Sequence, residues 1–496
     1  MRPVKRRLVP SAADLIFLVV VPVAATIGMV KLTQSDGDLA AHIRMGQTIL
    51  ATGHLPAHSL SSYTAAADPL VAHGWLSEII FSLLFSLGGL PLLTILTAMA
   101  IALTHGAIAV WLRRHGADPR WAFTAALVSL AVASTHWLTR PHLFSIIGVT
   151  LTLMLLENEN GKRRELLAIP LFMVWANLHG AWLYGITMIG AYIVGDLVEA
   201  GFSGQDRDAW LKRARTDALC LMLGLAATLV NPYGITLHRE VLSAATSASL
   251  AVNISEYLPP NFTEILQAPF IIAILSTITI FALTTKRIQW NWLVLILMSL
   301  FFALRSYRNI ALFGVSAWPL IALHASRAWP ARQKTFPWFR DFARLDSESR
   351  TGIIIVPFSI IALAIGLNHG RVGSVSIVPD HFSGRKFPVA AVARARAAGL
   401  QGNVFDAWVW GGYIMYAWPE ARLHVDPLKF NDTTIRSYAV IEDMKPGWQR
   451  EADRWNIRTI IVRSNSPMAK ALMSDQGWKL WYSDSTAALF RPASEP

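Results

Sequence analysis

The stretch that decides how this chain folds is Trp75-Leu-Ser-Glu-Ile-Ile-Phe-Ser-Leu-Leu-Phe-Ser-Leu-Gly88. It is apolar, but its length of about 14 residues is short for a bilayer span, which needs ~20 residues. A run of this length is more typical of an interfacial or re-entrant helix. The orientation of every later helix depends on whether this stretch crosses the membrane.

The composition of the chain indicates a membrane protein. Of its 496 residues, 53% are hydrophobic and 15% are charged, whereas a soluble domain carries about 25% charged residues. Apolar runs near spanning length recur along the first three quarters of the chain, and they predict about eleven transmembrane helices. We expect these helices at 12–32, 90–112, 120–138, 141–157, 165–179, 180–199, 216–231, 266–285, 290–304, 309–325 and 351–368.

The distribution of positive charge then indicates whether 75–88 crosses the membrane, because cytoplasmic loops of membrane proteins accumulate Lys and Arg. If 75–88 does not cross, one side of the membrane receives about 22 Lys and Arg residues in its loops. The opposite loops, the C-terminal region apart, hold only Arg44, Arg140, Arg239, Arg305 and Arg308. We therefore predict that 75–88 is a juxtamembrane helix on the outer face and that the N-terminus is cytoplasmic. The net charge of +12 is explained by these loops, so no nucleic-acid partner is expected.

The predicted organisation has two domains. Residues 1–368 form the transmembrane domain, which includes a long outer loop at 33–89. Residues 369–496 have ordinary polarity, with strand-like runs at 459–463 and 487–491 and an amphipathic segment at 389–399. We predict an all-α polytopic membrane protein that carries a small soluble α/β domain on its non-cytoplasmic side. The single cysteine, Cys220, excludes an intrachain disulfide and a multi-thiolate metal site.

Ionisable residues collect at the predicted outer ends of the helices, where they are functional candidates because burying them in a membrane is costly. Asp36-Gly37-Asp38 follows the first span, and the spacing of Asp38 and His42 puts both on one face of a helix. A carboxylate there can accept a proton from a hydroxyl or help to hold a metal ion. The alternative is a solvated turn that caps a helix.

His73 and Glu78 lie at the start of the juxtamembrane helix, where they would face a phosphate or a metal ion. The alternative is that this segment is an aromatic anchor at the interface. Arg140 begins a later span and could clamp a substrate phosphate through its planar fork, or pair with a lipid head group. His179 lies at another outer turn, where it binds substrate or hydrogen-bonds neighbouring helices.

Arg305 and Arg308 stand on the side that is normally poor in positive charge, so they indicate an anionic partner, either substrate or lipid. Taken together, the arginines favour a phosphate-bearing substrate and the carboxylates favour a hydroxyl acceptor. The sequence holds no Walker-type loop, Gly-rich dinucleotide fingerprint or serine-elbow motif, so no nucleotide cofactor is expected.

The sequence resembles the bacterial multi-spanning glycosyltransferases of the GT-C class over most of its length. The motifs that carry this resemblance are Asp36-Gly-Asp38-Leu-Ala-Ala-His42-Ile-Arg-Met-Gly46, Gly53-His-Leu-Pro56, Ser62-Tyr63-Thr64, His73-Gly-Trp75-Leu, Arg140-Pro141, Asn177-Leu-His179-Gly180, Asn231-Pro232-Tyr-Gly234, Arg308-Asn309, Val404-Phe405, Trp410-Gly411-Gly412-Tyr413 and Asp426. One position departs from the pattern. Where relatives carry an aspartate shortly after the loop proline, this chain has Ser59, with His58 beside it.

The resemblance implies a polytopic protein of the bacterial inner membrane that uses a polyprenyl-phosphate-linked sugar as donor. It implies transfer to a glycan or lipid acceptor on the non-cytoplasmic side, with inversion at the anomeric carbon. An acidic residue of the first outer loop acts as base in this class, which here is Asp36 or Asp38.

On this hypothesis the remaining candidates serve the phosphate of the donor. Arg140, Arg305 and Arg308 would stabilise the departing phosphate. The other proposed contacts are His42, His73, Glu78 and His179. Asp38, His73 and Glu78 are also candidate ligands of a divalent Mg or Mn ion.

Two other functions remain open at this point. A transporter or flippase of lipid-linked sugars would need ionisable residues near the bilayer midplane and pseudo-symmetric halves. A scaffold would bind glycans through 369–496 while its membrane part stayed inert.

Overall fold

The computed structural model describes residues 9–35, 37–158, 163–202, 206–247, 254–329, 341, 344–346, 349, 351–429 and 431–494. Contacts divide the chain into two compact units. One, called the helical unit, comprises Met1–Ile27, Ile95–Trp137 and Pro141–Ile365. The other, called the sheet unit, comprises Gly28–Thr94, Leu138–Arg140 and Gly366–Pro496.

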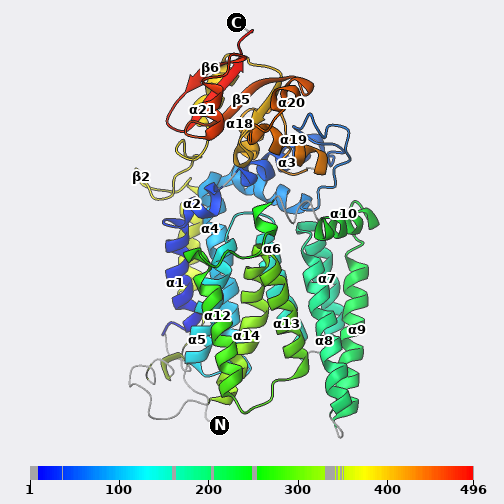
Figure 1. Ribbon diagram of the computed structural model, residues 1–496. Coiled ribbons are helices and arrows are strands. Elements are labelled where there is room, and N and C mark those ends of the chain that lie inside the picture. The colour runs from blue at the N-terminus through cyan, green and yellow to red at the C-terminus, as the bar shows by residue number, and fades with distance from the viewer. Residues whose placement is uncertain are drawn as a thin grey trace. The chain divides into compact units, whose positions relative to one another are not determined.

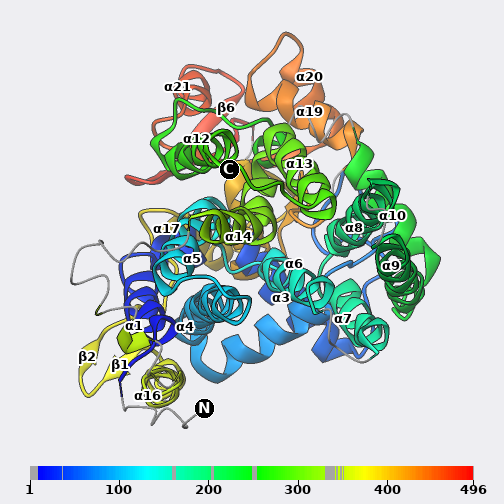
Figure 2. The same ribbon diagram turned by 90° about the horizontal axis from the view of Figure 1, so that it is seen from below.

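The helical unit is a bundle in which long helices run side by side, as Figure 1 shows for α5, α7, α8, α9, α13 and α14. Figure 2 looks along several of them. The helix α8 packs on α9 and α13, and α14 packs on α5 and α13. The elements of this unit are α1 (Ala12–Ala25), the second part of α4 (Trp75–Arg114), α5 (Pro119–Ala133), η1 (Ser134–His136), α6 (His142–Leu156), α7 (Arg164–Leu178), α8 (Trp182–Phe202), α9 (Arg207–Ala227), α10 (Ile235–Thr246), η2 (Ser255–Tyr257), η3 (Ile265–Gln267), α12 (Ala268–Leu283), α13 (Trp290–Arg305), η4 (Tyr307–Asn309), α14 (Ile310–Ala328) and most of α16 (Ile355–Leu367).

Within the described residues, a helix occupies most of each predicted span. Among the described residues, four helical stretches are long and apolar enough to cross a membrane: Trp75–Arg114, Trp182–Phe202, Ile265–Leu283 and Tyr307–Ala328. Ala12–Ala25, His142–Leu156, Trp290–Arg305 and Ile355–Leu367 are shorter apolar helices. The chain therefore has the helices of a polytopic membrane protein, while the total of about eleven crossings stays a prediction.

The decisive stretch 75–88 forms a helix of its own. The helix α4 spans Trp75–Arg114, but Gly88 (φ −155°, ψ 19°) and Gly89 (φ 63°, ψ −157°) are not helical, so two helices meet at a kink. The positive φ of Gly89 suits glycine, which lacks a Cβ. The backbone N–H of Leu90 donates to Asp380 Oδ1 at 2.9 Å and fixes the start of the second helix. The break between 75–88 and the following span is where the sequence predicts it, whereas an outer-face position of 75–88 remains a prediction.

A buried network of charges, called the Arg164 network, joins α6, α7, α8 and α9 of the helical unit. Arg164 forms an ion pair with Asp217. Arg213 contacts Glu157 Oε1 at 3.1 Å and Asp196 Oδ2 at 3.5 Å. All three carboxylates are buried. These residues were not among the predicted site residues, because the spacing of residues along the chain does not show which helices pair.

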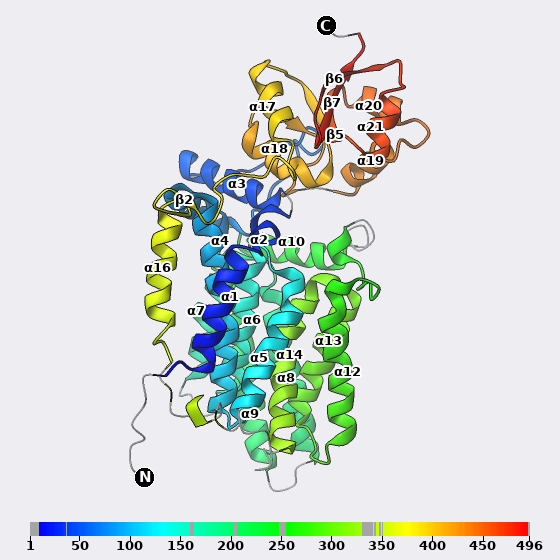
Figure 3. The ribbon, with the colours of Figure 1, turned by 90° about the vertical axis from the view of Figure 1, so that its left-hand side faces the viewer.

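The sheet unit contains a five-stranded mixed sheet in the order β4-β3-β5-β7-β6. Strand β3 pairs in parallel with β4 and β5, and β7 pairs antiparallel with β5 and β6. Figure 3 shows α17 and α18 on one face of the sheet and α19, α20 and α21 on the other. The elements are α2 (Met29–Gln34), α3 (Asp38–Thr52), the first part of α4, β1 (Arg371–Val372), β2 (Val375–Ser376), α17 (Val389–Ala397), β3 (Asn403–Asp406), η5 (Trp408–Trp410), α18 (Gly411–Ala417), β4 (Arg422–Leu423), α19 (Asp432–Glu442), α20 (Trp448–Arg454), β5 (Ile457–Arg463), α21 (Pro467–Leu472), β6 (Trp478–Ser483) and β7 (Ala487–Pro492).

Alternation along the strands builds a hydrophobic core on each face, because successive side chains of a strand point to opposite sides. Val404 and Leu489 pack into the core that includes α17 and α18. Their neighbours Phe405 and Phe490 pack with Ile460 into the core that includes α19, α20 and α21. Burial on both faces explains why these strands read as continuous apolar runs.

The segment 61–63, which belongs to the predicted outer loop 33–89, extends this sheet. The Leu423 N–H of β4 donates to the Ser61 carbonyl at 2.7 Å, and the Tyr63 N–H donates to the Leu423 carbonyl at 3.0 Å. Ser62 and Leu423 form a parallel bridge. The predicted boundary between 368 and 369, with 33–89 in the transmembrane domain, stays a prediction. Contacts group residues 28–94 with the C-terminal region.

Candidate active site

The helix α3 carries the first pair of candidate residues. It begins at Asp38 and includes His42, so the predicted shared face follows from the helical spacing of the two residues. A carboxylate in the first turn also interacts favourably with the helix dipole. Asp36, the other candidate base, lies outside the described residues.

Asp38 and Arg140 form an ion pair, with 3.1 Å between Arg140 Nη2 and Asp38 Oδ2. The Thr139 N–H donates to the Leu32 carbonyl at 2.7 Å, which holds the segment 138–140 against α2 and delivers Arg140. The Asp38 side chain is 36% exposed and that of Arg140 is 13% exposed. The structure thus brings together a predicted base and a predicted phosphate-binding residue, and leaves the carboxylate open to solvent.

A second pair lies one turn further along α3. His42 Nδ1 is 3.3 Å from Glu78 Oε1, which comes from the first part of α4. Glu78 is buried, and its Oε2 has no hydrogen-bond partner among the residues that the structure describes. Gly46 lets the two helices approach closely, because a Cβ there would overlap the Glu78 backbone. A buried acceptor that lacks a hydrogen-bond partner destabilises the folded state. Glu78 Oε2, beside His42, can therefore accept a further hydrogen bond.

The C-terminal region fixes the start of α3. The Gly37 N–H donates to the Val409 carbonyl at 2.9 Å. A Cβ on Gly412 would overlap the Gly37 carbonyl, so only glycine permits this approach. Sequence analysis noted the motif around Gly412 but gave it no link to Asp38, because the two segments are far apart along the chain.

His73 is both a predicted phosphate contact and a predicted metal ligand. His73 is exposed, and its N–H donates to the Val71 carbonyl at 2.8 Å in the turn before α4. Within the described residues, no group of three or more His, Cys, Asp or Glu side chains is placed to hold a metal ion. Asp38 and Glu78 are engaged with Arg140 and His42 instead. The divalent ion therefore stays a prediction.

A buried polar cluster lies at the ends of β3 and β4 and joins motif residues that had no predicted role, Ser59, Tyr63 and Asp426, to His424, which the motifs do not include. Tyr63 Oη contacts His424 Nδ1 at 2.8 Å, and Ser59 Oγ donates to Asp426. Burial lowers the pKa of His424 to about 4 and raises the pKa of Asp426. Burial also raises the pKa of Asp406 well above its usual value. Asp406 ends β3 and His424 follows β4, so the carboxyl ends of parallel strands are the signal that could have found them.

The helical unit holds the other predicted site residues. His179 follows α7 and is buried, with Nδ1 at 2.7 Å from Ser145 Oγ, which accepts the Trp175 Nε1–H at 2.8 Å. Arg305 ends α13 and is exposed. Arg308 lies in η4, with its guanidinium carbon 4.7 Å from the centre of the Tyr257 ring. Their roles toward a substrate remain predictions.

Comparison with solved structures identifies the fold. The oligosaccharyltransferase AglB from Archaeoglobus fulgidus, in complex with an inhibitory peptide and a dolichol-phosphate, matches with a TM-score of 0.55 and 12% identity over 97% of this chain and 74% of that one. The apo form of the Archaeoglobus fulgidus oligosaccharyltransferase matches with a TM-score of 0.55 and 13% identity over the same shares of the two chains. ArnT from Cupriavidus metallidurans, bound to undecaprenyl phosphate, matches with a TM-score of 0.51 and 13% identity over 97% of this chain and 98% of that one.

Comparisons of sequence alone find no counterpart. No protein-family profile matches the chain, and no curated protein matches it by sequence. The structural likeness nevertheless shows that this chain has the fold of the GT-C glycosyltransferases, as the resemblance in its motifs predicts.

Proposed function

We propose that this GT-C-fold protein is a glycosyltransferase that moves a sugar from a polyprenyl-phosphate-linked donor to a hydroxyl group of a glycan or lipid. Transfer takes place on the non-cytoplasmic side of a bacterial inner membrane and inverts the anomeric carbon. The observation that carries the proposal is the Asp38–Arg140 ion pair at the start of α3. Two structures of similar fold, one in complex with a dolichol-phosphate and one bound to undecaprenyl phosphate, support a lipid-phosphate substrate.

The chemistry is a single displacement. The acceptor oxygen attacks the anomeric carbon while the Asp38 carboxylate takes the hydroxyl proton. The bond between the anomeric carbon and the phosphate oxygen breaks, and its electron pair leaves with the polyprenyl phosphate. Attack from the face opposite the leaving group inverts the configuration. Asp36 is the alternative base.

Arg140 stabilises the negative charge that develops on the leaving phosphate. A guanidinium has five N–H donors, so its contact with Asp38 leaves donors for phosphate oxygens. The ion pair keeps the base and the phosphate-binding arginine within reach of one bound donor, whose anomeric carbon has the acceptor oxygen on one face and the leaving phosphate on the other. Arg305, Arg308 and His179 are proposed as further contacts to the phosphate.

The His42–Glu78 pair orients the donor in this proposal. A carboxylate that contacts one imidazole nitrogen fixes the ring and its tautomer, which leaves the second nitrogen for a ligand. His73 is proposed to lie against the same phosphate. No step requires a metal ion.

The test is a sugar-transfer assay with the full-length protein, undecaprenyl-phosphate-linked hexoses as donors and cell-envelope glycolipids as acceptors. Replacing the base, Asp36→Asn or Asp38→Asn, is expected to lower the rate by about 10²- to 10⁴-fold, the usual contribution of general base catalysis. The exposed Asp453 on α20 provides a matched control, Asp453→Asn, that should leave the rate unchanged. If both Asp36→Asn and Asp38→Asn keep wild-type activity, the assignment of the base is wrong.

A further inference from the structure

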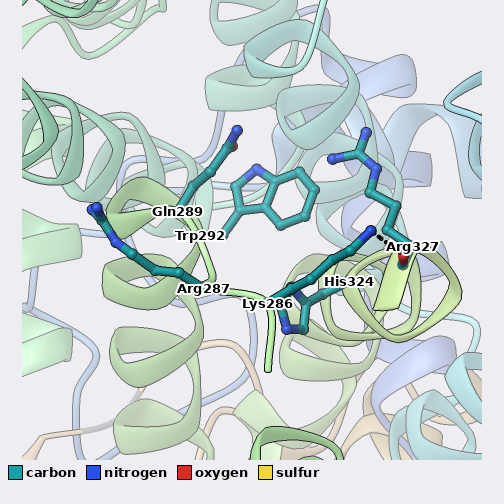
Figure 4. Close-up of a pocket in the computed structure, with 6 residues that line it drawn as sticks. All are labelled: Lys286, Arg287, Gln289, Trp292, His324 and Arg327. Carbon is teal, nitrogen blue, oxygen red and sulfur yellow. Dashed lines mark hydrogen bonds between the residues drawn. The ribbon is translucent and has the colours of Figure 1, made fainter. Parts of the chain in front are cut away.

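A basic cavity of about 270 Å³ lies in the helical unit, between the chain that follows α12, the beginning of α13 and the end of α14. Figure 4 shows the side chains around it, with Arg287 and Arg327 on opposite sides of the view and Trp292 between them. Its lining residues are Lys286, Arg287, Gln289, Trp292, His324 and Arg327. The volume suits a small polar group and not a whole lipid-linked sugar.

The positive charge of this cavity is only partly compensated. Arg287 pairs with the buried Glu199, with 2.7 Å between Nη2 and Oε2. In the described part of the chain, neither Lys286 nor Arg327 forms an ion pair. The Lys286 ammonium donates to the Arg327 backbone carbonyl at 2.6 Å, and the Arg327 guanidinium carbon lies 5.1 Å from the centre of the Trp292 ring. Among the residues that the structure describes, no carboxylate therefore neutralises these two cations of the cavity.

The neutral groups of the cavity can also bind an anion. The Gln289 side chain adds an amide N–H donor. His324 is buried, with Nε2 3.3 Å from Thr284 Oγ1. The Trp292 indole is engaged, because its Nε1–H donates to Glu157 at 2.9 Å. The side chain of Trp292 is thus fixed, and Arg327 rests against a rigid ring.

The cavity is remote from the proposed site residues at the other end of the same helix. Gln289 precedes α13 and Arg305 ends it. A helix rises 1.5 Å per residue, so the 16 residues of α13 separate the two ends by about 24 Å. By the charge distribution of the loops, the cavity lies at the predicted cytoplasmic ends of the helices.

The neighbouring surface of α12 is apolar and exposed. Ile272, Leu275, Ile278 and Leu283 are each more than half exposed. In a bilayer, exposed apolar side chains such as these contact lipid acyl chains. A ligand in the cavity can therefore have its head group among cations and its chains along α12.

We propose that this cavity binds the anionic phosphate of a membrane phospholipid head group. Phosphate oxygens accept charge-assisted hydrogen bonds from ammonium and guanidinium groups, and basic pockets between helix ends on the cytoplasmic side are suited to anionic lipids. Lys286 and Arg327 supply the charge and Gln289 a neutral donor. A soluble phosphate would use the same chemistry, and the apolar surface of α12 favours the lipid.

The experiment uses the full-length protein in nanodiscs of phosphatidylcholine, with or without phosphatidylglycerol. Bound lipid is measured by native mass spectrometry, and stability by the unfolding midpoint. The variant Lys286→Gln/Arg327→Gln is expected to lower phosphatidylglycerol binding by about tenfold, since each basic residue near an anionic lipid contributes appreciably. The control Lys212→Gln/Arg215→Gln removes the same charge from exposed positions of α9 and should change binding little.

The remaining arms separate the sources of phosphate. Inorganic phosphate is added to the protein in pure phosphatidylcholine. If it stabilises the wild type but not the cavity variant, the cavity binds a soluble phosphate. Equal phosphatidylglycerol binding by the wild type, the cavity variant and the control overturns the proposal. If the double variant does not fold, the single variant Arg327→Gln is compared with wild type in the same assays, and unchanged binding again overturns it.

Discussion

The Arg164 network and the Asp38–Arg140 pair are both made of arginines and carboxylates, yet their surroundings differ. In the Arg164 network the carboxylates of Glu157, Asp196 and Asp217 are buried against two arginines. In the sheet unit, the Asp38 side chain is 36% exposed, and one carboxylate oxygen of the neighbouring Glu78 has no hydrogen-bond partner within the described part of the chain. Charges that are buried against one another hold helices together, whereas charges with an open side can act on a ligand.

The largest expected effect comes from breaking the buried network. Arg164→Met leaves Asp217 buried without its partner, and removing one member of a buried pair costs about 3–5 kcal/mol. We expect a large fall in the yield of folded protein and in the unfolding midpoint, with the specific transfer rate of the folded fraction unchanged. An unfolding midpoint equal to that of the wild type would mean that the network does not stabilise the bundle.

The open pair should show the opposite behaviour. Arg140→Gln is expected to lower sugar transfer by about 10²- to 10³-fold, the effect of removing one preorganised donor to a developing anion. Its unfolding midpoint should change little, because the pair is partly exposed. The transfer rate and the unfolding midpoint are measured on the same samples of this variant. Full activity of the variant contradicts the role assigned to Arg140.

The buried His424 makes the stability of the sheet unit depend on pH. Burial lowers its pKa to about 4, whereas an unfolded histidine titrates near 6.5. The unfolded chain therefore binds a proton that the folded one rejects, so stability is fully present above pH ~6.5 and is lost as the pH falls toward 4. The loss reaches ~3 kcal/mol at most.

The unfolding midpoint of the full-length protein, measured between pH 7 and pH 5, tests this dependence. The variant His424→Gln should flatten the profile over this range. A profile as steep in His424→Gln as in the wild type would assign the dependence to other groups.

The smallest expected effect concerns the contact that positions α3. Gly412→Ala places a Cβ against the Gly37 carbonyl, and such overpacking costs about 1–3 kcal/mol. We expect a larger effect on the rate of sugar transfer than on the unfolding midpoint, because the displaced segment carries Asp38. The control Gly190→Ala in α8 meets nothing within 4 Å. Equal activity of the two variants would show that this contact does not position the site.

The sequence by itself determined the helical membrane part, the break after residue 88 and the C-terminal α/β segment. These properties depend on local composition and periodicity, which neighbouring residues set together. The spacing of Asp38 and His42 likewise placed both residues on one face, since helical geometry is local.

Only the tertiary structure decided the partners of these residues. Arg140 reaches Asp38 from a segment about 100 residues away in the sequence, and Gly412 meets Gly37 from much further. The segment 61–63 joins the C-terminal sheet through backbone hydrogen bonds that any side chain permits. Such contacts depend on how distant surfaces pack, and no local pattern of residues encodes them.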